Sequence, residues 1–411
     1  AALLLMANGS AGAAPLAQTD TGWVRGVESH GTRSFLGLPY AKPPLGDLRW
    51  RAPVRPEPWR GVRAANAFAP ACLQRGVSIP GEPTPRTSED CLYINVWSPA
   101  RNAHAPAPVM VWIHGGGYTN GAAALPLYWG DRLARRGVVV VTFSYRLGPL
   151  GYLAHPELSA ESEHAASGNY GMMDQTAALE WVSRNIARFG GDPHNVTVFG
   201  QSAGAASVSL LIASPRASGL FHRVIAQSGG VFEPTELAPQ YLLRQAENDG
   251  LAYARSLGAT SLAQLRALPA ERLLEGAAGQ VSHPVIEPNM LPLSPYEAYV
   301  RGVQNDVPIL IGSNAEEANS LVNLDAVTAA NFTEAITQAW GALPAPLIQA
   351  YPFTDDAGAR IARAGFERDL RFGWDMWAWA RLQAHAGRHA AFYYRFSHRP
   401  PFPAGSVRAE W

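Results

Sequence analysis

A serine flanked by small residues is the feature of the sequence best suited to covalent chemistry. It lies in residues 200–204 (GQSAG), between a short apolar segment at 196–199 and a run of helical character at 205–211. A tight turn between strand and helix needs small neighbours and leaves the hydroxyl exposed at the helix N-terminus, where the dipole favours developing negative charge. The pattern predicts a nucleophile elbow with Ser202 as the nucleophile. The alternative is an ordinary Gly/Ser turn.

A glycine-rich segment could stabilise the negative oxygen that such a nucleophile creates. Residues 114–118 (HGGGY) directly follow the apolar segment 109–113 and precede the serine in the chain. Acyl transfer needs N–H groups aimed at the oxyanion, and glycine lets the backbone approach closely. We therefore expect the oxyanion hole to consist of the N–H groups of Gly116, Gly117 and Ala203. The alternative is a flexible glycine loop without a catalytic role.

The elements that must position these residues follow an alternating pattern. Segments 109–113, 138–143 and 196–199 are apolar throughout, which is typical of strands inside a parallel sheet. Residues 170–189 have helical spacing and end at 190–193 (GGDP). The alternation predicts an α/β fold with ligands at the carboxyl ends of the strands.

The remaining chain is expected to complete the same domain. Before residue 105, short β-rich runs at 34–40 and 92–97 alternate with Pro and Gly, which indicates an antiparallel lead-in. After residue 235 we expect helices with strands at 307–311 and 391–396. The prediction is one domain over residues 15–411, divided into a lead-in (15–105), a catalytic core (106–235) and a helical cover with late strands (236–411).

Composition excludes several classes of function. Thirty-three basic residues balance thirty-three acidic ones without a run of like charge. The sequence therefore lacks the cluster of basic residues that binding to nucleic acid or an anionic membrane requires. No apolar run reaches the roughly 18 residues of a membrane helix. Histidines and carboxylates do not cluster at ligand spacing, so we expect no metal and no organic cofactor. A small neutral substrate fits this composition, and oligomeric state cannot be read from it.

Two features indicate export. Residues 1–14 combine a short apolar run with small residues suited to cleavage, which predicts the remnant of a signal peptide and a secreted or periplasmic protein. The alternative is a frayed, Ala-rich terminus. Cys72 and Cys91 are the only cysteines, and a Pro- and Gly-rich segment separates them. A disulfide would persist after export and contribute about 3 kcal/mol to the stability of the fold. Without export, the alternative is two buried free thiols.

Beyond the two candidate sites, five further segments carry a family resemblance. They are residues 35–44 (FLGLPYAKPP), 88–95 (SEDCLYIN), 168–171 (GNYG), 189–193 (FGGDP) and 227–229 (QSG). Over nearly its whole length the chain resembles the type-B carboxylesterase and cholinesterase family, and in particular bacterial carboxylesterases of the para-nitrobenzyl esterase type. The resemblance implies an α/β-hydrolase fold, with a mainly parallel central sheet flanked by helices. It also implies pairing of Cys72 with Cys91.

The same resemblance implies a Ser-Glu-His triad, in which the acid orients the histidine and stabilises its charged form. The family's acid segment corresponds to residues 312–317 (GSNAEE) of this chain, which assigns the acid to Glu317. Ala318 stands where relatives usually carry glycine. Glu316 is the alternative acid, because a loop shift of one residue would exchange the two carboxylates.

The histidine of the triad is not assigned by this pattern. After the acid come His385 and His389, near the end of a helix that starts at about residue 371, and then His398 behind the last predicted strand. The family's base follows a few residues after the equivalent of 410–411, where this sequence ends. We therefore expect a copy truncated at its C-terminal part, without its base. His398 is the alternative, on triad order and strand position.

The segment between the cysteines bears on the substrate. In cholinesterases the corresponding loop carries a tryptophan that binds choline, whereas residues 73–90 contain no aromatic residue. The resemblance therefore favours hydrolysis of short-chain or aromatic carboxylic esters through an acyl-enzyme. The alternatives are a non-catalytic cholinesterase-like binding protein, an inactive fragment of the esterase, and an amidase or lipase on the same fold.

Overall fold

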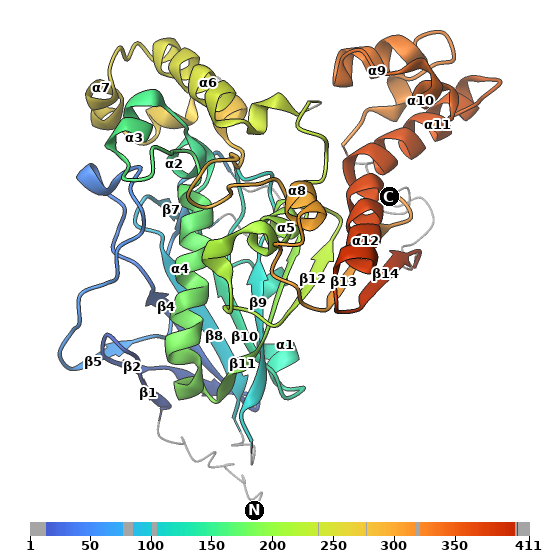
Figure 1. Cartoon of the computed structure of the whole chain (residues 1–411). Helices are drawn as coiled ribbons and strands as arrows, with labels where there is room; N and C mark the ends of the chain where they lie inside the picture. Colours follow the sequence, from blue (N-terminus) through green and yellow to red (C-terminus); the bar gives the residue numbers. More distant parts are fainter. Residues whose placement is uncertain are drawn as a thin grey trace, which may run out of the picture.

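A large twisted sheet forms the centre of the protein (Figure 1). The computed structural model describes residues 14–76, 85–100, 105–236, 238–276, 278–317, 321–398 and 401. Within this part, nine strands follow the spatial order β14-β13-β12-β11-β9-β10-β8-β4-β3. Their bounds are β3 (Val27–Ser29), β4 (Thr32–Pro39), β8 (Tyr93–Pro99), β9 (Ala107–Ile113), β10 (Val139–Phe143), β11 (Gly191–Gln201), β12 (Arg223–Gln227), β13 (Ile309–Asn314) and β14 (Ala391–Phe396).

The pairing of the strands changes from parallel to antiparallel at β10. Strands β3, β4 and β8 pair antiparallel, and β8 is also antiparallel to β10, whereas β10, β9, β11, β12, β13 and β14 run parallel. Apolar side chains in the middle of β9, β10 and β11 are almost completely buried, as at Val111, Val141 and Val198, whereas the edge strand β14 is mostly exposed. The expected α/β fold with a mainly parallel sheet is therefore confirmed. Two of the nine strands, β3 and β12, were not predicted from the sequence.

Small sheets and connecting helices surround the large sheet. Strands β1 (Leu16–Gln18), β2 (Trp23–Arg25) and β5 (Val62–Ala64) form one small sheet, and β6 (Ala71–Cys72) pairs with β7 (Thr87–Ser88). The α-helices are α1 (Asp131–Ala134), α2 (Gly148–Tyr152), α3 (Pro156–Glu161), α4 (Tyr170–Asn185), α5 (Ala203–Ala213), α6 (Leu243–Ser256), α7 (Leu262–Ala267), α8 (Pro295–Val300), α9 (Phe332–Trp340), α10 (Ala345–Gln349), α11 (Asp356–Arg368) and α12 (Trp374–Ala386).

Helix α5 lies at the centre of the packing. All its residues are buried, and it packs against β11, β12, β9 and α8. The predicted helix over 170–189 is α4 followed by a 3₁₀ turn at Ile186–Phe189, which Gly190 ends with a left-handed φ of 85°. Helix α12 packs against β13 and β14. Helices and sheet together place the start of α5 at the carboxyl ends of β11 and β9.

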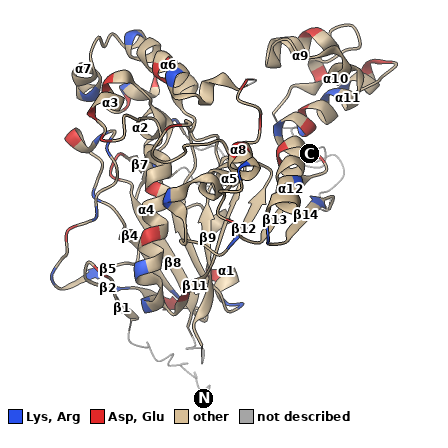
Figure 2. Cartoon of the chain, viewed as in Figure 1, with Lys and Arg blue, Asp and Glu red and all other residues tan. Residues whose placement is uncertain are grey.

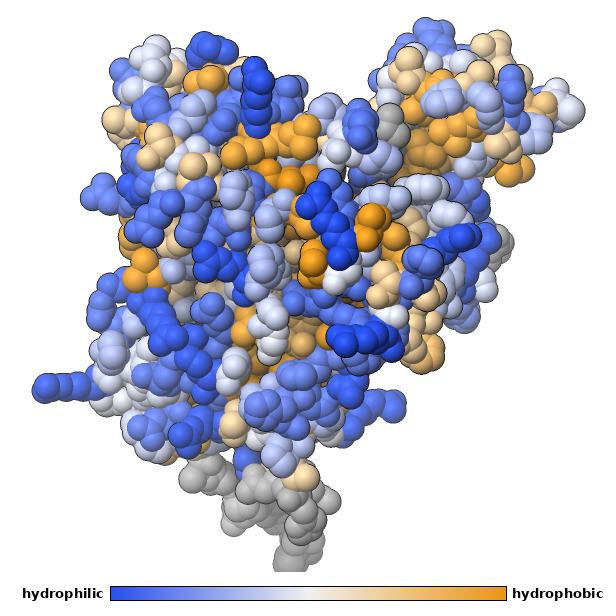
Figure 3. All heavy atoms as spheres, viewed as in Figure 1, coloured by the Kyte–Doolittle hydropathy of each residue, from blue (hydrophilic) through white to orange (hydrophobic). Residues whose placement is uncertain are grey.

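The C-terminal part projects from this body. Helices α9, α10 and α11 form a lobe beside the sheet, in orange-red in Figure 1, with a small apolar cluster of its own that includes Phe332, Ile336 and Phe366. A π-helical turn at Asp369–Gly373 joins α11 to α12, so the predicted helix from about residue 371 is α12. Figure 3 shows apolar residues at the surface of the lobe, where Ile361 is 74% exposed.

Charge is spread over the whole molecule. Figure 2 shows basic and acidic residues interspersed along the helices and loops, in keeping with the equal numbers of the two kinds. No described helix has the length and apolar character needed to cross a bilayer. Residues 1–13, which contain nearly all of the predicted signal-peptide remnant, lie outside the described residues.

A buried ion pair ties the carboxyl end of β10 to α4. Two nitrogens of the Arg146 guanidinium bond the two carboxylate oxygens of Asp174, at 2.8 and 2.7 Å, and the Arg146 N–H donates to the same carboxylate at 3.0 Å. Both side chains are almost completely buried. The preceding residue, Tyr145, donates its hydroxyl to the carbonyl of His114 at 2.8 Å. The ion pair therefore helps to hold the backbone of the glycine-rich loop.

We predict that Arg146→Leu lowers the free energy of unfolding by about 3–5 kcal/mol, because it leaves the buried Asp174 carboxylate without compensation. The matched control is Arg135→Leu, which breaks a surface pair with Asp131 and should cost less than about 1 kcal/mol. Urea denaturation of both variants measures the difference. Equal losses of unfolding free energy in the two variants would show that the buried pair stabilises the fold no more than the surface pair does.

Candidate active site

The predicted nucleophile lies in a strained turn between β11 and α5. Ser202 has φ of 55° and ψ of −126°, a backbone conformation that costs free energy in a residue other than glycine. Its N–H donates to the carbonyl of Gln227 at the end of β12 (2.9 Å), and its own carbonyl accepts from the N–H of Ala206 in α5 (2.9 Å). The turn is therefore fixed from the sheet on one side and from the helix on the other.

Close backbone contacts around the turn explain its small residues. A Cβ on Gly204 would lie 2.1 Å from the carbonyl oxygen of Ile113, and a Cβ on Gly200 would lie 2.5 Å from the backbone of Gly204. On the other side, a Cβ on Gly229 would lie 2.3 Å from the carbonyl oxygen of Ser202. Real Cβ atoms do not approach so closely, so these positions require glycine.

The glycine-rich loop after β9 lies directly beside the serine. A Cβ on Gly115 would be 3.1 Å from the Cβ of Ser202. Gly116 and Gly117 have left-handed φ values of 115° and 58°. The N–H of Ala203 belongs to the first residue of α5 and has no acceptor within the helix. The structure thus packs the start of the glycine-rich loop, which continues into Gly116 and Gly117, against Ser202.

His114, whose role was not predicted from the sequence, fixes the start of this loop. Its ring is buried, its Nδ1 lies 2.9 Å from the carbonyl oxygen of Gly115, and it stacks on Tyr145 with ring centroids 4.5 Å apart. Burial lowers the pKa of His114 to about 4. The ring is therefore neutral at neutral pH, and its Nδ1–H donates to Gly115.

The predicted acid is connected to the elbow through one serine. Glu317 follows β13, and its carboxylate accepts from the N–H of Asn314 (2.8 Å) and from the hydroxyl of Ser228. Ser228 stands between Gln227, whose carbonyl binds the Ser202 N–H, and Gly229, which packs against Ser202. In the sequence, the motif at 227–229 is only a family signal, and it does not indicate this role of Ser228.

The alternative acid, Glu316, is more exposed than Glu317. Glu316 is exposed, and its charge raises the pKa of Arg368 as a minor contribution behind that of Asp369. The carboxylate of Glu317 hydrogen-bonds to Ser228, which lies between the two residues that contact Ser202.

The described histidines do not complete a triad. His389 lies 3.3 Å from the carboxylate of Asp306, and His385 lies near the end of α12. His398 follows β14, the neighbour of β13, but is exposed and contacts the ring of Phe396 at 6.1 Å between centroids. Among the residues that the structure describes, no histidine hydrogen-bonds to Ser202 or Glu317. Residues 410–411 lie outside the described part.

Two buried carboxyl groups lie behind the loop that follows β12. The N–H of Phe232 donates to the carboxyl of Asp375 (3.0 Å), and a Cβ on Gly230 would lie 2.9 Å from the Cβ of Asp375. Burial raises the pKa of both Glu233 and Asp375, and repulsion by Glu233 raises that of Asp375 further. Sequence analysis did not find this pair.

The cysteines form the expected disulfide. The Cα atoms of Cys72 and Cys91 are 4.8 Å apart, and both side chains are buried. Cys91 leads into β8, so the bridge ties the loop between the cysteines to the central sheet.

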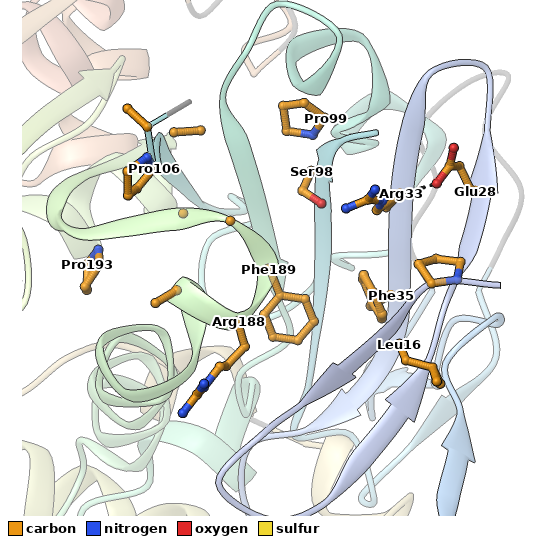
Figure 4. A pocket seen from close by; sticks show the side chains of 16 residues that line it. Leu16, Glu28, Arg33, Phe35, Ser98, Pro99, Pro106, Arg188, Phe189 and Pro193 are labelled. Carbon is orange, nitrogen blue, oxygen red and sulfur yellow. Dashed lines mark hydrogen bonds and ion pairs between the residues drawn. The ribbon is translucent and has the colours of Figure 1, made fainter. Parts of the chain in front are cut away.

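One cavity of about 620 Å³ lies far from the serine (Figure 4). It is bordered by Leu16, Arg33, Phe35 and Arg188, and by the backbone at 190–191. Gly191 pairs with Ala107 where β11 and β9 begin, whereas Ser202 follows the carboxyl end of β11. The cavity therefore lies at the end of the sheet opposite the candidate site.

A strained turn between strand and helix, next to a glycine loop on the neighbouring strand, is typical of the α/β-hydrolase fold. The model of the carboxylesterase family matches residues 13–409, and the chain belongs to this family.

Two curated relatives illustrate the relationship. The chain is 39% identical over 364 residues to a fumonisin B1 esterase of Sphingopyxis macrogoltabida, a match that covers 86% of this chain and 66% of the relative. It is 42% identical over 316 residues to a para-nitrobenzyl esterase of Bacillus subtilis (strain 168), with coverage of 73% and 62%. The matches thus span slightly less than two thirds of the length of these relatives.

Solved structures agree with the fold. A PNB esterase superimposes with a TM-score of 0.79 at 36% identity, over 94% of this chain and 81% of that one. A carboxylesterase of Geobacillus stearothermophilus, EST55, reaches a TM-score of 0.81 at 33% identity, over 94% and 80%.

We predict that Gly204→Ala destabilises the protein by about 1–3 kcal/mol, because the added methyl group meets the carbonyl of Ile113. The control is Gly279→Ala, where no atom lies within 4 Å of the added Cβ. Thermal denaturation compares the two variants. If both melt like the unchanged chain, the elbow is not packed as tightly as the structure indicates.

We also predict that burial of His114 makes the free energy of unfolding sensitive to acid. Since its pKa is lowered from 6.5 to about 4, the unfolded chain binds this proton more tightly, so stability is lost as the pH falls from 6.5 towards 4. His114→Gln should therefore reduce the drop in unfolding free energy between about pH 7 and about pH 5. Urea denaturation at the two pH values measures it, and an unchanged drop in the variant would contradict the assignment.

Proposed function

We propose that the chain is a serine carboxylesterase that hydrolyses short-chain or aromatic carboxylic esters. The observation that carries the proposal is the strained Ser202 turn with the glycine loop packed against it, so that a Cβ on Gly115 would reach within 3.1 Å of the Ser202 Cβ. Membership of the carboxylesterase family and similarity to relatives named as esterases support the same reaction.

In the proposed reaction, the Oγ of Ser202 attacks the ester carbonyl carbon while its proton passes to a general base. The carbonyl oxygen becomes negative and accepts hydrogen bonds from the N–H groups of Gly116, Gly117 and Ala203. The C–O bond to the alcohol then breaks, and the alcohol leaves with the proton from the base. Water attacks the resulting acyl-Ser202 in the same way, which releases the acid and restores the hydroxyl.

Glu317 is proposed as the acid of the triad. Its hydrogen bonds to Asn314 and Ser228 support this choice over the exposed Glu316, because they hold the carboxylate next to the residues that pack on Ser202. In a triad, such a carboxylate orients the histidine and stabilises its charged form.

We leave the base unassigned among the described histidines. Only His398 follows the strand adjacent to β13, which supports it as the alternative, whereas its exposure argues against a role as base.

An oxidising compartment also suits the protein. We propose a secreted or periplasmic location, supported by the buried Cys72–Cys91 disulfide, since such bonds persist outside the cytosol.

We expect Ser202-dependent hydrolysis of p-nitrophenyl butyrate. Ser202→Ala should abolish turnover, and Glu317→Gln should lower kcat by several orders of magnitude, whereas Glu316→Gln should leave it nearly unchanged. Release of p-nitrophenolate measures all variants, and circular dichroism checks that each is folded.

Two further proteins in the same assay address the base. If turnover is lost in His398→Ala, then His398 is the base. If it appears only after the C-terminal segment of the Bacillus subtilis relative is fused to residue 411, then that segment supplies the base. Hydrolysis that survives in Ser202→Ala would overturn the proposed mechanism, and folded proteins without any Ser202-dependent turnover would favour a non-catalytic binding protein.

A further inference from the structure

Gln74 connects the disulfide loop to the glycine-rich loop. Its side chain is buried, with 6% exposed, two residues after Cys72. Its Nε2 donates to the carbonyl of Cys72 (2.8 Å) and to that of Gly121 (2.7 Å), and its Oε1 accepts from the N–H of Gly121 (2.8 Å). One primary amide thus binds both backbone polar groups of Gly121 and, at the same time, a cysteine of the disulfide.

Gly121 is the point where the glycine-rich loop closes on itself. It has a left-handed φ of 126°, and a Cβ there would lie 2.2 Å from the Nδ1 of His114 and 2.5 Å from the carbonyl oxygen of Gly115. Within the loop, the carbonyl of Gly116 accepts from the N–H groups of Thr119 (3.0 Å) and Asn120 (3.1 Å). The loop is therefore a closed turn whose two ends touch, and Gln74 holds the closing residue.

We propose that Gln74 is a positioning residue for the oxyanion hole: it transmits the restraint of the Cys72–Cys91 disulfide to the loop and keeps the N–H groups of Gly116 and Gly117 in place. The inference rests on the function proposed above. Stabilisation of an oxyanion depends on donors that are already in position, and small displacements cost rate without preventing substrate binding. Gln74 acts through Gly121 and has no contact with the substrate in this role.

Other contacts keep the fold intact when Gln74 is replaced. Ala71, Ala122 and Leu125 form a small buried cluster, and the Thr142 hydroxyl donates to the carbonyl of Ala123 at 3.1 Å. These contacts anchor the chain after Gly121. At Gly121 itself, the side-chain amide of Gln74 hydrogen-bonds to both the N–H and the carbonyl group. A Gln74→Met variant, which keeps the volume and removes the amide, should therefore fold while its loop loosens.

Hydrogen exchange tests the positioning without any need for turnover. In the full chain, Gln74→Met should raise the exchange rate of the amides in 115–121 by roughly tenfold or more, because it removes the two hydrogen bonds that hold Gly121. The amides of α5 should be unaffected.

The matched control for this experiment is Asn185→Leu. Asn185 is also a buried amide, which accepts from the N–H of Asp20 (2.7 Å) and donates to Trp181 (3.0 Å), but it lies at the far end of α4. This variant should leave exchange in 115–121 unchanged. Equal exchange of the loop in Gln74→Met and the unchanged chain would overturn the proposal.

Reduction of the disulfide adds a second test. Opening the Cys72–Cys91 bond should speed exchange of the loop in the unchanged chain, but should add little in Gln74→Met, because the connection is already lost. Equal acceleration by reduction in both proteins would show that the disulfide does not act through Gln74 and would overturn that part of the proposal.

Kinetics then separate positioning from binding. With p-nitrophenyl butyrate, Gln74→Met should lower kcat by about 10- to 100-fold while KM changes little, and Asn185→Leu should retain both values. A variant with a loosened loop and unchanged kcat would overturn the role in catalysis. If Ser202-dependent turnover is absent both from the unchanged chain and from its fusion to the C-terminal segment of the Bacillus subtilis relative, the proposed function fails, and the exchange experiments still decide whether Gln74 holds the loop.

Discussion

The strained backbone of Ser202 is the constraint on which the candidate site depends. A left-handed φ at a residue with a side chain is unfavourable, and here it persists because sheet and helix restrain the residue together. Strands β9 and β12 contribute carbonyl groups and close backbone contacts, while α5 begins immediately afterwards. The turn leaves the hydroxyl at the helix N-terminus, beside a loop whose glycines can present their N–H groups.

Further contacts hold the glycine-rich loop beside the Ser202 turn from two sides. The Arg146–Asp174 ion pair fixes the backbone next to Tyr145, and Tyr145 holds the carbonyl of His114. On the other side, Gln74 binds Gly121, the closing residue of the loop. The antiparallel lead-in therefore contributes to the site through the disulfide loop, although Ser202 and its glycine neighbours belong to the parallel part of the sheet.

The sequence predicted well those features that local pattern determines. Fully apolar runs identified β9, β10 and β11, and small residues around Ser202 identified the turn, because both follow from steric rules over a few residues. Strand β12 was missed because its burial alternates and its outer residues are polar or half-exposed, as at Arg223. The start of β13 was predicted two residues early, which is the usual uncertainty at an element boundary.

The contacts that support the site could not be predicted in the same way. Gln74 and Gly121 are 47 residues apart, and Ser228 and Glu317 are 89 apart, so only the folded chain brings them together. A family resemblance can name a position such as 227–229, but it does not say which partner that position binds. The disulfide was predictable because the chain has only two cysteines.

The most direct measurement is to trap the acyl group on the protein. The chain is mixed with p-nitrophenyl acetate, quenched with acid, digested and analysed by mass spectrometry, next to its Ser202→Ala variant. The account predicts one acetyl group on the peptide that contains Ser202, and none at that position in the variant. An acetyl group found only on other residues, or hydrolysis that continues in the variant, would contradict Ser202 as the nucleophile.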